Sequence, residues 1–358
     1  MRITANQVTF FRLVMMPPLA VMLYTGTETT LIVAGVLGTL IGCTDFVDGY
    51  LARKHGPTVL GGLMDPIADK VFIAVGFLPY ADLGWVPWWL VLALFLREFL
   101  VTAVRSSFEL RQKPLRSSYV AKVKTWVQMV GLGLILYALI IHSRVVMMSI
   151  LVFFCAAPLI GWAIARARGW RWTGALVGAA GFALCVLCYG LWGAHGLTIA
   201  LFVAIVGITW ASGLDYLALG ARELLRSRDF HAFDAVRLAG ALALPVLAVL
   251  ALVYARAPAW ALITLVAVEL AVGGLDNLLA HHGAAARPLE WGARTLGAAA
   301  LLGAALALPA RADLFAVAAA AVSVAGTAVA FVRGRRYYLD AGLRDEKRAV
   351  AAAAAGAR

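Results

Sequence analysis

Residues 45–70 read DFVDGYLARKHGPTVLGGLMDPIADK, with four aspartates between two apolar segments. Asp45 and Asp48 are three residues apart, so they share one face of a helix. Asp65 and Asp69 are four residues apart and share a face in the same way. The intervening KHGPTVLGG has the glycine and proline content of a turn. The stretch therefore predicts a helical hairpin that brings four carboxylates together at the depth of the membrane interface.

Four neighbouring carboxylates repel one another, and a divalent cation relieves that repulsion. Hard oxygen ligands suit Mg²⁺ or Mn²⁺, and four carboxylates can hold two ions, which orient a phosphate during its transfer. Arg53 follows Asp48 closely enough to meet that phosphate. Gly49 and Ala52 are small and leave room for a bulky ligand. The alternative is a set of solvated or helix-capping acids, which four acids at these spacings disfavour.

The rest of the chain is strongly apolar. Of its 358 residues, 63% are hydrophobic and 14% are charged, and the mean hydropathy is +0.88. In lipid, backbone groups must find their hydrogen-bond partners within the protein. The composition thus predicts an all-α, polytopic integral membrane bundle of about twelve spans. The spans are expected at residues 7–25, 30–51, 66–83, 86–108, 119–141, 146–165, 172–192, 197–216, 235–254, 259–280, 294–309 and 313–332.

The basic residues are distributed unevenly between the two sides of this predicted topology. The formal net charge is +12, and most Lys and Arg residues outside the spans fall on the side of the aspartates. The opposite side has only Arg144, Arg256 and Arg311. This positive-inside pattern predicts that both termini and the aspartates face the cytoplasm. It accounts for the basic charge without a nucleic-acid partner and favours anionic lipids and substrates.

A weak internal repeat relates the two ends of the chain. RLVMMPPLAVML from Arg12 is similar to RLAGALALPVLAVL from Arg237, and DGYLARKHG from Asp48 is similar to DNLLAHHG from Asp276. The second copy has Gly273 in the place of Asp45 and lacks the later acids. We therefore expect either a chemically inactive partial repeat or a chance similarity between helices rich in Ala and Leu.

The aspartate stretch resembles the signature of the CDP-alcohol phosphatidyltransferases, which here reads Asp45-xx-Asp48-Gly49-xx-Ala52-Arg53 and then Gly61-xxx-Asp65-xxx-Asp69. The gap between Arg53 and Gly61 is a single residue shorter than the usual form. The resemblance implies a helical membrane enzyme that uses Mg²⁺ or Mn²⁺, with two ions. Such an enzyme moves a phosphatidyl group from CDP-diacylglycerol to an alcohol and releases CMP.

The same resemblance implies a role for each signature residue. Asp45, Asp48 and Asp65 would bind the metal ions, and Asp69 would complete the second ion site. Asp65 and Asp69 would be the catalytic residues, with Asp69 as the base for the acceptor hydroxyl. The nucleotide of CDP-diacylglycerol would be bound by Asp48, Gly49, Ala52, Arg53 and Gly61.

Further stretches resemble the phosphatidylglycerophosphate synthases within this family, namely NQVTFFRLVMMPP at 6–18, DPIADK at 65–70, LREFLVTAVR at 96–105 and AKVKTWVQM at 121–129. The acceptor would then be sn-glycerol 3-phosphate, and the products phosphatidylglycerophosphate and CMP. This acceptor is a dianion and needs a basic pocket that opens to the cytoplasm. Arg105, Lys122 and Lys124 are the candidates, with positive-inside topology alone as the alternative explanation.

The resemblance covers about 1–130 and 205–228, which implies a division of the chain. We expect a CDP-alcohol phosphatidyltransferase domain at 1–230, with an insertion of two spans within 143–195. An additional membrane domain at 231–332 and a basic, Ala-rich cytoplasmic tail at 333–358 would follow. Family members usually pair, so a homodimer is expected, and the predicted location is a bacterial inner membrane.

Other functions remain open at this point. A member of the same family could use inositol phosphate, serine or phosphatidylglycerol as acceptor. The number of spans also fits a transporter or channel, although a transporter would place its polar site at the bilayer midplane between repeats. The region after residue 230 could instead serve as a scaffold that modifies a dimer contact.

Overall fold

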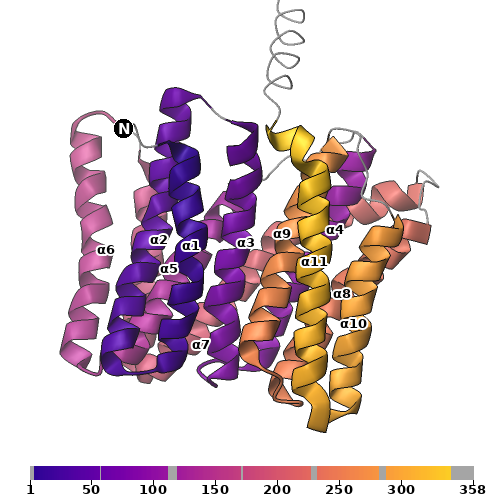
Figure 1. Ribbon diagram of the computed structural model, residues 1–358. Coiled ribbons are helices and arrows are strands. Elements are labelled where there is room, and N and C mark those ends of the chain that lie inside the picture. Colours follow the sequence, from indigo (N-terminus) through magenta and orange to yellow (C-terminus); the bar gives the residue numbers. More distant parts are fainter. Residues whose placement is uncertain are drawn as a thin grey trace, which may run out of the picture.

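The structure is a computed structural model that describes residues 4–56, 58–111, 119–170, 172–226, 232–281 and 288–339. Within these ranges every regular element is a helix, which confirms the predicted all-α fold class (Figure 1). The first helices are α1 (Ala5–Thr25), α2 (Glu28–His55), α3 (Val59–Asp82), α4 (Trp88–Leu110), α5 (Tyr119–Ile140) and α6 (Arg144–Ala167). They are followed by α7 (Thr173–Arg226), α8 (Ala232–Val253), α9 (Ala259–His281), α10 (Pro288–Ala307), the 3₁₀ turn η1 (Pro309–Arg311) and α11 (Ala312–Leu339).

Short polar caps begin the helices that carry the site. The Thr4 side chain accepts from the backbone of Gln7 in a capping box that begins α1. Gly26 ends α1 in the left-handed region with φ of 68°, where glycine carries no steric penalty. Thr27 and Thr58 cap α2 and α3 in the same manner as Thr4. The sequence thus fixes where the α1, α2 and α3 helices begin.

The surface of the bundle is suited to lipid. Eight segments of the described chain are long and apolar enough to cross a membrane, and one of them, Gly174–Leu214, contains two predicted spans. Large apolar side chains lie on the outside, such as Phe153 with 63% and Leu314 with 64% of their surfaces exposed. Exposed apolar side chains around whole helices are expected where the solvent is hydrocarbon. The protein is an integral membrane protein with several spans.

Helix α7 is divided by a glycine. Gly193 has φ of 69° and ψ of −162°, a conformation that is open to glycine and closed to other residues. An unbroken helix of 54 residues would be about 80 Å long, far more than a bilayer needs. The predicted spans 172–192 and 197–216 lie on either side of this break. Within the described residues the twelve predicted spans fall on eleven α-helices, but α3, α4 and α10 are not among the segments that are long and apolar enough to cross a membrane.

Helix α3 lies between two groups of helices (Figure 1), and α4 packs against α7, α8 and α9. On one side α1 packs against α2 and α3, α5 packs against α2 and α7, and α6 packs against α7. On the other side α9 packs against α3 and α4, and α8 packs against α4 and α10. The segment Phe72–Ala81 of α3 is buried throughout, and the Phe77 and Phe202 rings meet edge to face with centroids 5.2 Å apart. This central position gives α3 contact with both groups.

A buried polar network joins the last three helices. The Oε1 atom of Glu269 in α9 accepts from Arg294 Nε at 3.1 Å and from Ser323 Oγ at 2.9 Å. Its Oε2 atom accepts from the Thr295 hydroxyl at 3.1 Å. The Glu269, Arg294 and Ser323 side chains are all buried. These hydrogen bonds link α9, α10 and α11 where lipid could supply no partners.

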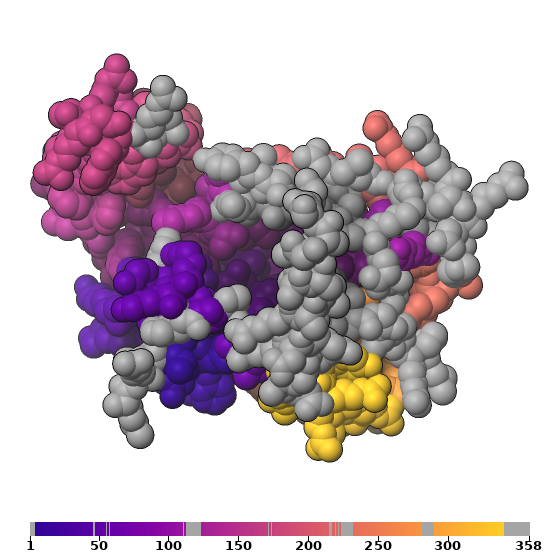
Figure 2. Space-filling model, turned by 90° about the horizontal axis from the view of Figure 1, so that it is seen from above, coloured from indigo at the N-terminus to yellow at the C-terminus, as the bar shows by residue number. Residues whose placement is uncertain are grey.

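The predicted regions of the chain include the following helices, and their division into domains stays a prediction. The predicted insertion within 143–195 corresponds to α6 and the first part of α7, which pack together at a corner of the face that Figure 2 shows. The predicted extra domain at 231–332 corresponds to α8–α11. Helix α11 continues to Leu339, into the predicted tail, and residues 340–358 lie outside the described ranges.

Candidate active site

One arginine of α1 lies at the centre of the aspartate cluster. Arg12 is 1% exposed, and its Nη2 atom is 3.0 Å from Asp45 Oδ1 and also donates to Asp48 Oδ2. Its Nη1 atom donates to Asp69 Oδ1 at 3.2 Å. Asp45 and Asp48 come from the end of α2, and Asp69 comes from the first half of α3. The hairpin of α2 and α3 therefore surrounds the Arg12 guanidinium, which α1 provides.

A threonine one turn earlier in α1 reaches the remaining aspartate. The Thr9 hydroxyl lies 3.2 Å from Asp48 Oδ2 and 3.0 Å from Asp65 Oδ1. Thr9 and Asp48 are fully or almost fully buried, whereas Asp45 and Asp69 remain about one-third exposed. All four aspartates that the sequence singled out thus gather around two side chains of α1.

The chemistry of this cluster fits a hard divalent cation. Four carboxylates face one guanidinium, so negative charge is in excess, and every carboxylate oxygen is a ligand type that Mg²⁺ and Mn²⁺ prefer. As the side chains stand, no three acidic, Cys or His side chains within the described ranges enclose a common ion position. Arg12 occupies the space between the carboxylates and supplies the countercharge there.

The predicted nucleotide-binding residues lie on the second half of α2 and at the start of α3. Gly49 and Ala52 are partly buried on α2, and Arg53 is exposed with its Nη1 atom 3.6 Å from the position of a Cβ on Gly49. Gly61 lies at the start of α3, where its N–H donates to the Thr58 hydroxyl at 2.8 Å. A Cβ at Gly61 would lie 2.9 Å from Asn6 Oδ1, so a larger residue there would require the Asn6 side chain of α1 to shift.

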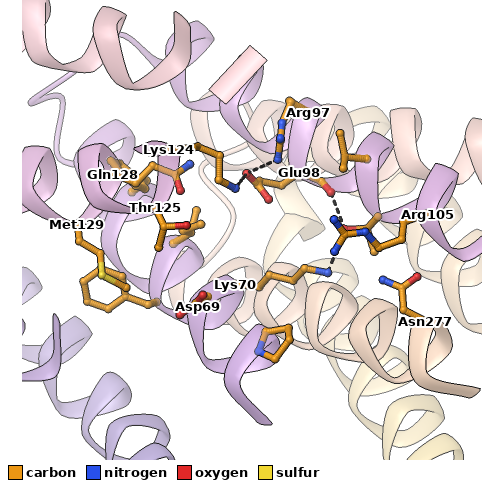
Figure 3. Close-up of a pocket in the computed structure, with 16 residues that line it drawn as sticks. Asp69, Lys70, Arg97, Glu98, Arg105, Lys124, Thr125, Gln128, Met129 and Asn277 are labelled. Carbon is orange, nitrogen blue, oxygen red and sulfur yellow. Dashed lines mark hydrogen bonds and ion pairs between the residues drawn. The ribbon is translucent and has the colours of Figure 1, made fainter. Parts of the chain in front are cut away.

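A cavity of about 170 Å³ adjoins the aspartate cluster (Figure 3). Asp69 belongs to its wall and at the same time accepts from Arg12 in the cluster. The wall also contains apolar side chains and four cationic ones, namely Lys70, Arg97, Arg105 and Lys124. A small anion that entered this cavity would therefore lie beside Asp69 and among four basic groups.

Glu98 holds two of those basic groups in place. Its Oε1 atom accepts from Lys124 Nζ at 2.8 Å and from Arg97 Nη1 at 3.1 Å. Arg97 Nη2 also donates to the Ser212 hydroxyl at 2.8 Å. The segment WASGLDYL at 210–217 thus meets α4 through Ser212, and Arg97 and Glu98 orient their neighbours.

The structure places two of the three predicted acceptor-binding residues in the cavity wall. Arg105 and Lys124 both line the cavity. Lys122 falls on α5, but its side chain lies outside the described part of the structure. Arg111, a further basic residue of α4, pairs with Asp234 of α8, its Nη2 atom 2.7 Å from Asp234 Oδ2.

The N-terminal part of the chain matches a known family. The model of the CDP-alcohol phosphatidyltransferase family matches residues 2–159. A CDP-diacylglycerol–glycerol-3-phosphate 3-phosphatidyltransferase of Salmonella choleraesuis is 32% identical over 171 residues, which are 45% of this chain and 92% of that protein. Its counterpart in Rickettsia bellii is 34% identical over 134 residues, or 36% of this chain and 72% of that protein.

The chain belongs to the CDP-alcohol phosphatidyltransferase family.

Another relative is a probable phosphatidylglycerophosphate synthase of Mycobacterium tuberculosis, strain H37Rv, which is 37% identical over 134 residues. That alignment covers 36% of this chain and 64% of the relative, less than two thirds of its length. All the predicted metal, nucleotide and acceptor residues lie inside the family match, whereas α8–α11 lie beyond it. Members of the CDP-alcohol phosphatidyltransferase family generally depend on a divalent metal ion.

Several residues of the site were not predicted as such. Thr9 and Arg12 belong to the aspartate cluster, and Lys70 and Asn277 to the cavity wall. The sequence contained a signal for Arg12, because an ionisable residue inside a predicted span is rarely without a function. It contained none for Asn277, which is far along the chain.

The predicted internal repeat has one counterpart in the structure. Arg12 pairs with Asp48, and the matching residues Arg237 and Asp276 also form an ion pair, with Nη2 and Oδ2 3.6 Å apart. Both members of the second pair are buried. Gly273 stands where a second acid would be required, so this part of the bundle keeps one charge pair without the carboxylate cluster.

Proposed function

We propose that this protein transfers a phosphatidyl group from CDP-diacylglycerol to sn-glycerol 3-phosphate, yielding phosphatidylglycerophosphate and CMP. The proposal depends above all on the position of Asp69, which belongs both to the carboxylate cluster and to the basic cavity. A group in that position can contact both a substrate bound at the carboxylate cluster and a substrate bound in the cavity. The names of the relatives from Salmonella and Rickettsia support the same pair of substrates.

In this proposal the acceptor hydroxyl oxygen attacks the phosphorus that carries diacylglycerol. The bond from that phosphorus to the CMP oxygen breaks, and CMP leaves with the electron pair. Asp69 takes the proton of the acceptor hydroxyl as general base. Arg12 and Arg53 stabilise negative charge that develops on the diphosphate, which is the main contribution of a protein to this type of reaction.

Asp45, Asp48, Asp65 and Asp69 would hold one or two Mg²⁺ or Mn²⁺ ions. When bound, such ions neutralise the diphosphate and the oxygen that leaves with CMP. Thr9 and Arg12 keep the carboxylates of α2 and α3 close together. Asp48, Gly49, Ala52, Arg53 and Gly61 would bind the nucleotide.

The acceptor would enter the cavity of about 170 Å³, whose size favours a small polar alcohol. Arg105, Lys122 and Lys124 would bind its phosphate. Glu98 fixes the direction of Lys124 through a hydrogen bond of 2.8 Å. A dianionic acceptor thus matches the charge of the wall.

The proposed setting is a bacterial inner membrane with the active site on the cytoplasmic side. The basic residues outside the spans gather on the side of the aspartates, as the positive-inside rule requires. The ends of α2 and α11 lie at the same end of the bundle as the start of α3 (Figure 1). We also infer that the catalytic domain ends near residue 230, with α8–α11 as an added unit, and that the protein pairs as a homodimer.

The test is release of CMP from CDP-diacylglycerol by the purified protein in detergent with Mg²⁺. Glycerol 3-phosphate, inositol phosphate, serine and phosphatidylglycerol would be supplied in parallel. We expect release with glycerol 3-phosphate alone, loss of release after chelation of the metal, and background activity for Asp65→Ala. Release with another acceptor would assign that alcohol instead. Substrate uptake into proteoliposomes without CDP-diacylglycerol, together with no CMP release, would favour a transporter.

Lys124→Ala is expected to raise the KM for glycerol 3-phosphate by about tenfold or more, since it removes a charge-assisted hydrogen bond to the acceptor. The KM for CDP-diacylglycerol should stay nearly constant. Arg166→Ala is the matched control, because Arg166 lies near the end of α6 and stacks over the Trp162 ring, outside the cavity wall. An unchanged acceptor KM would leave membrane topology as the sole explanation for Lys124.

A further inference from the structure

Helix α9 contributes to the cavity although it lies beyond the family match. The match ends at residue 159, and α9 spans Ala259–His281. Asn277 nevertheless belongs to the cavity wall, together with Thr102 and Arg105 of α4 (Figure 3). The added unit α8–α11 is thus part of the boundary of the proposed acceptor site and not a separate appendage.

Two glycines allow α9 to come this close. A Cβ at Gly273 would lie 2.6 Å from Thr102 Cγ2, a separation that side chains do not adopt without a shift. A Cβ at Gly274 would lie 3.2 Å from Ile67 Cγ1 of α3. Asn277 follows Gly273 by about one helical turn and therefore shares its face. The contact that brings the two helices together also directs Asn277 to the cavity.

The Asn277 side chain is oriented by a hydrogen bond. Its Oδ1 atom accepts from the Ser106 hydroxyl of α4, with 2.5 Å between the oxygens, and Ser106 is buried. With Oδ1 engaged in this way, the amide nitrogen is directed toward Arg105 and Lys70 (Figure 3). An amide nitrogen carries two hydrogens and can only donate. A donor fixed among cations is suited to an oxygen of an anion.

We propose that Asn277 donates a hydrogen bond to the phosphate of the acceptor, so that the added membrane unit helps to select the acceptor. This inference rests on the proposed function of the cavity. The ligand class is an alcohol that carries a phosphate group. Lys70, Arg105 and Lys124 in the cavity wall would attract the phosphate by charge, and Asn277 would orient it through a hydrogen bond. Asn277 is a binding residue in this scheme and takes no part in proton transfer.

The test compares Asn277→Asp with the wild-type protein. Aspartate keeps the size of the side chain but places a negative charge where the dianion would bind. We expect the KM for glycerol 3-phosphate to rise by about tenfold or more and the KM for CDP-diacylglycerol to stay within about twofold. Thr264→Ala on the same helix is the control, because the Thr264 hydroxyl donates to the carbonyl of Trp260 within α9 and Thr264 is not part of the cavity wall. Equal acceptor KM values for Asn277→Asp and wild type would overturn the inference.

A binding measurement separates this inference from the proposed function. Glycerol 3-phosphate would be titrated into wild type, Asn277→Asp and Asn277→Leu in detergent, with the melting temperature as readout. Stabilisation of the wild type that is lost in both variants supports the role of Asn277, even if no CMP is released and the proposed reaction is wrong. Stabilisation that is equal in all three proteins, or absent from the wild type, overturns it. Asn277→Leu covers the case in which Asn277→Asp does not fold.

Discussion

Replacement of Asp69 by asparagine is expected to lower kcat by about 10²–10⁴-fold, the usual contribution of a general base. Asparagine keeps the shape of the side chain, and its Oδ1 atom can still accept from Arg12 Nη1, which lies 3.2 Å from the aspartate oxygen. It cannot take a proton from the acceptor hydroxyl at neutral pH. Binding of CDP-diacylglycerol, measured by its effect on the melting temperature, should therefore change little.

The control for this variant is Asp82→Asn, at the other end of the same helix α3. It should leave both kcat and the binding of CDP-diacylglycerol as they are in the wild type. If Asp69→Asn lost binding to the same extent as turnover, Asp69 would serve mainly to hold the diphosphate or its metal ion. The base would then have to be sought elsewhere in the cavity.

The second large effect concerns stability and lies outside the active site. Glu269→Ala removes the carboxylate that accepts from Arg294, Thr295 and Ser323, and leaves a buried guanidinium without its counter-ion. Breaking a buried pair in this way costs about 3–5 kcal/mol. We expect the free energy of unfolding in detergent to fall by that amount, measured by denaturant titration with far-UV circular dichroism.

The chain contains a matched exposed pair for comparison. Glu290 of α10 forms an ion pair with Arg333 of α11, with the two side chains 40% and 55% exposed. Such exposed pairs contribute about 0–1 kcal/mol, so Glu290→Ala should change stability little. A similar loss for both variants would mean that Glu269 contributes no more than a surface charge does.

The aspartate hairpin could be predicted from the sequence because its information is local. Spacings of three and four residues set the shared faces of Asp45 with Asp48 and of Asp65 with Asp69, and the glycines and proline between them mark the turn. The break in α7 could also be predicted from the local sequence, because a gap in hydropathy separates the predicted spans 172–192 and 197–216. The structure adds that Gly193 makes this break.

The contributions of α1 and α9 to the site could not be predicted in this way. Arg12 meets Asp69 across 57 positions of sequence, and Ser106 meets Asn277 across 171. Which face of α1 or α9 points inward depends on how the helices rotate when they pack, and small residues such as Gly273 decide this only in the presence of Thr102. The inward faces of α1 and α9 are therefore defined only when the helices pack together, and the local sequence does not reveal them.

The position of Arg12 in α1 also bears on how the protein is made. A ribosome synthesises the chain from its N-terminus, so α1 reaches the bilayer before α2 and α3 bring their aspartates. The guanidinium that pairs with Asp45, Asp48 and Asp69 is then already in place when those acids arrive. The nascent chain thus carries part of the countercharge for the hairpin in a helix that is made before it.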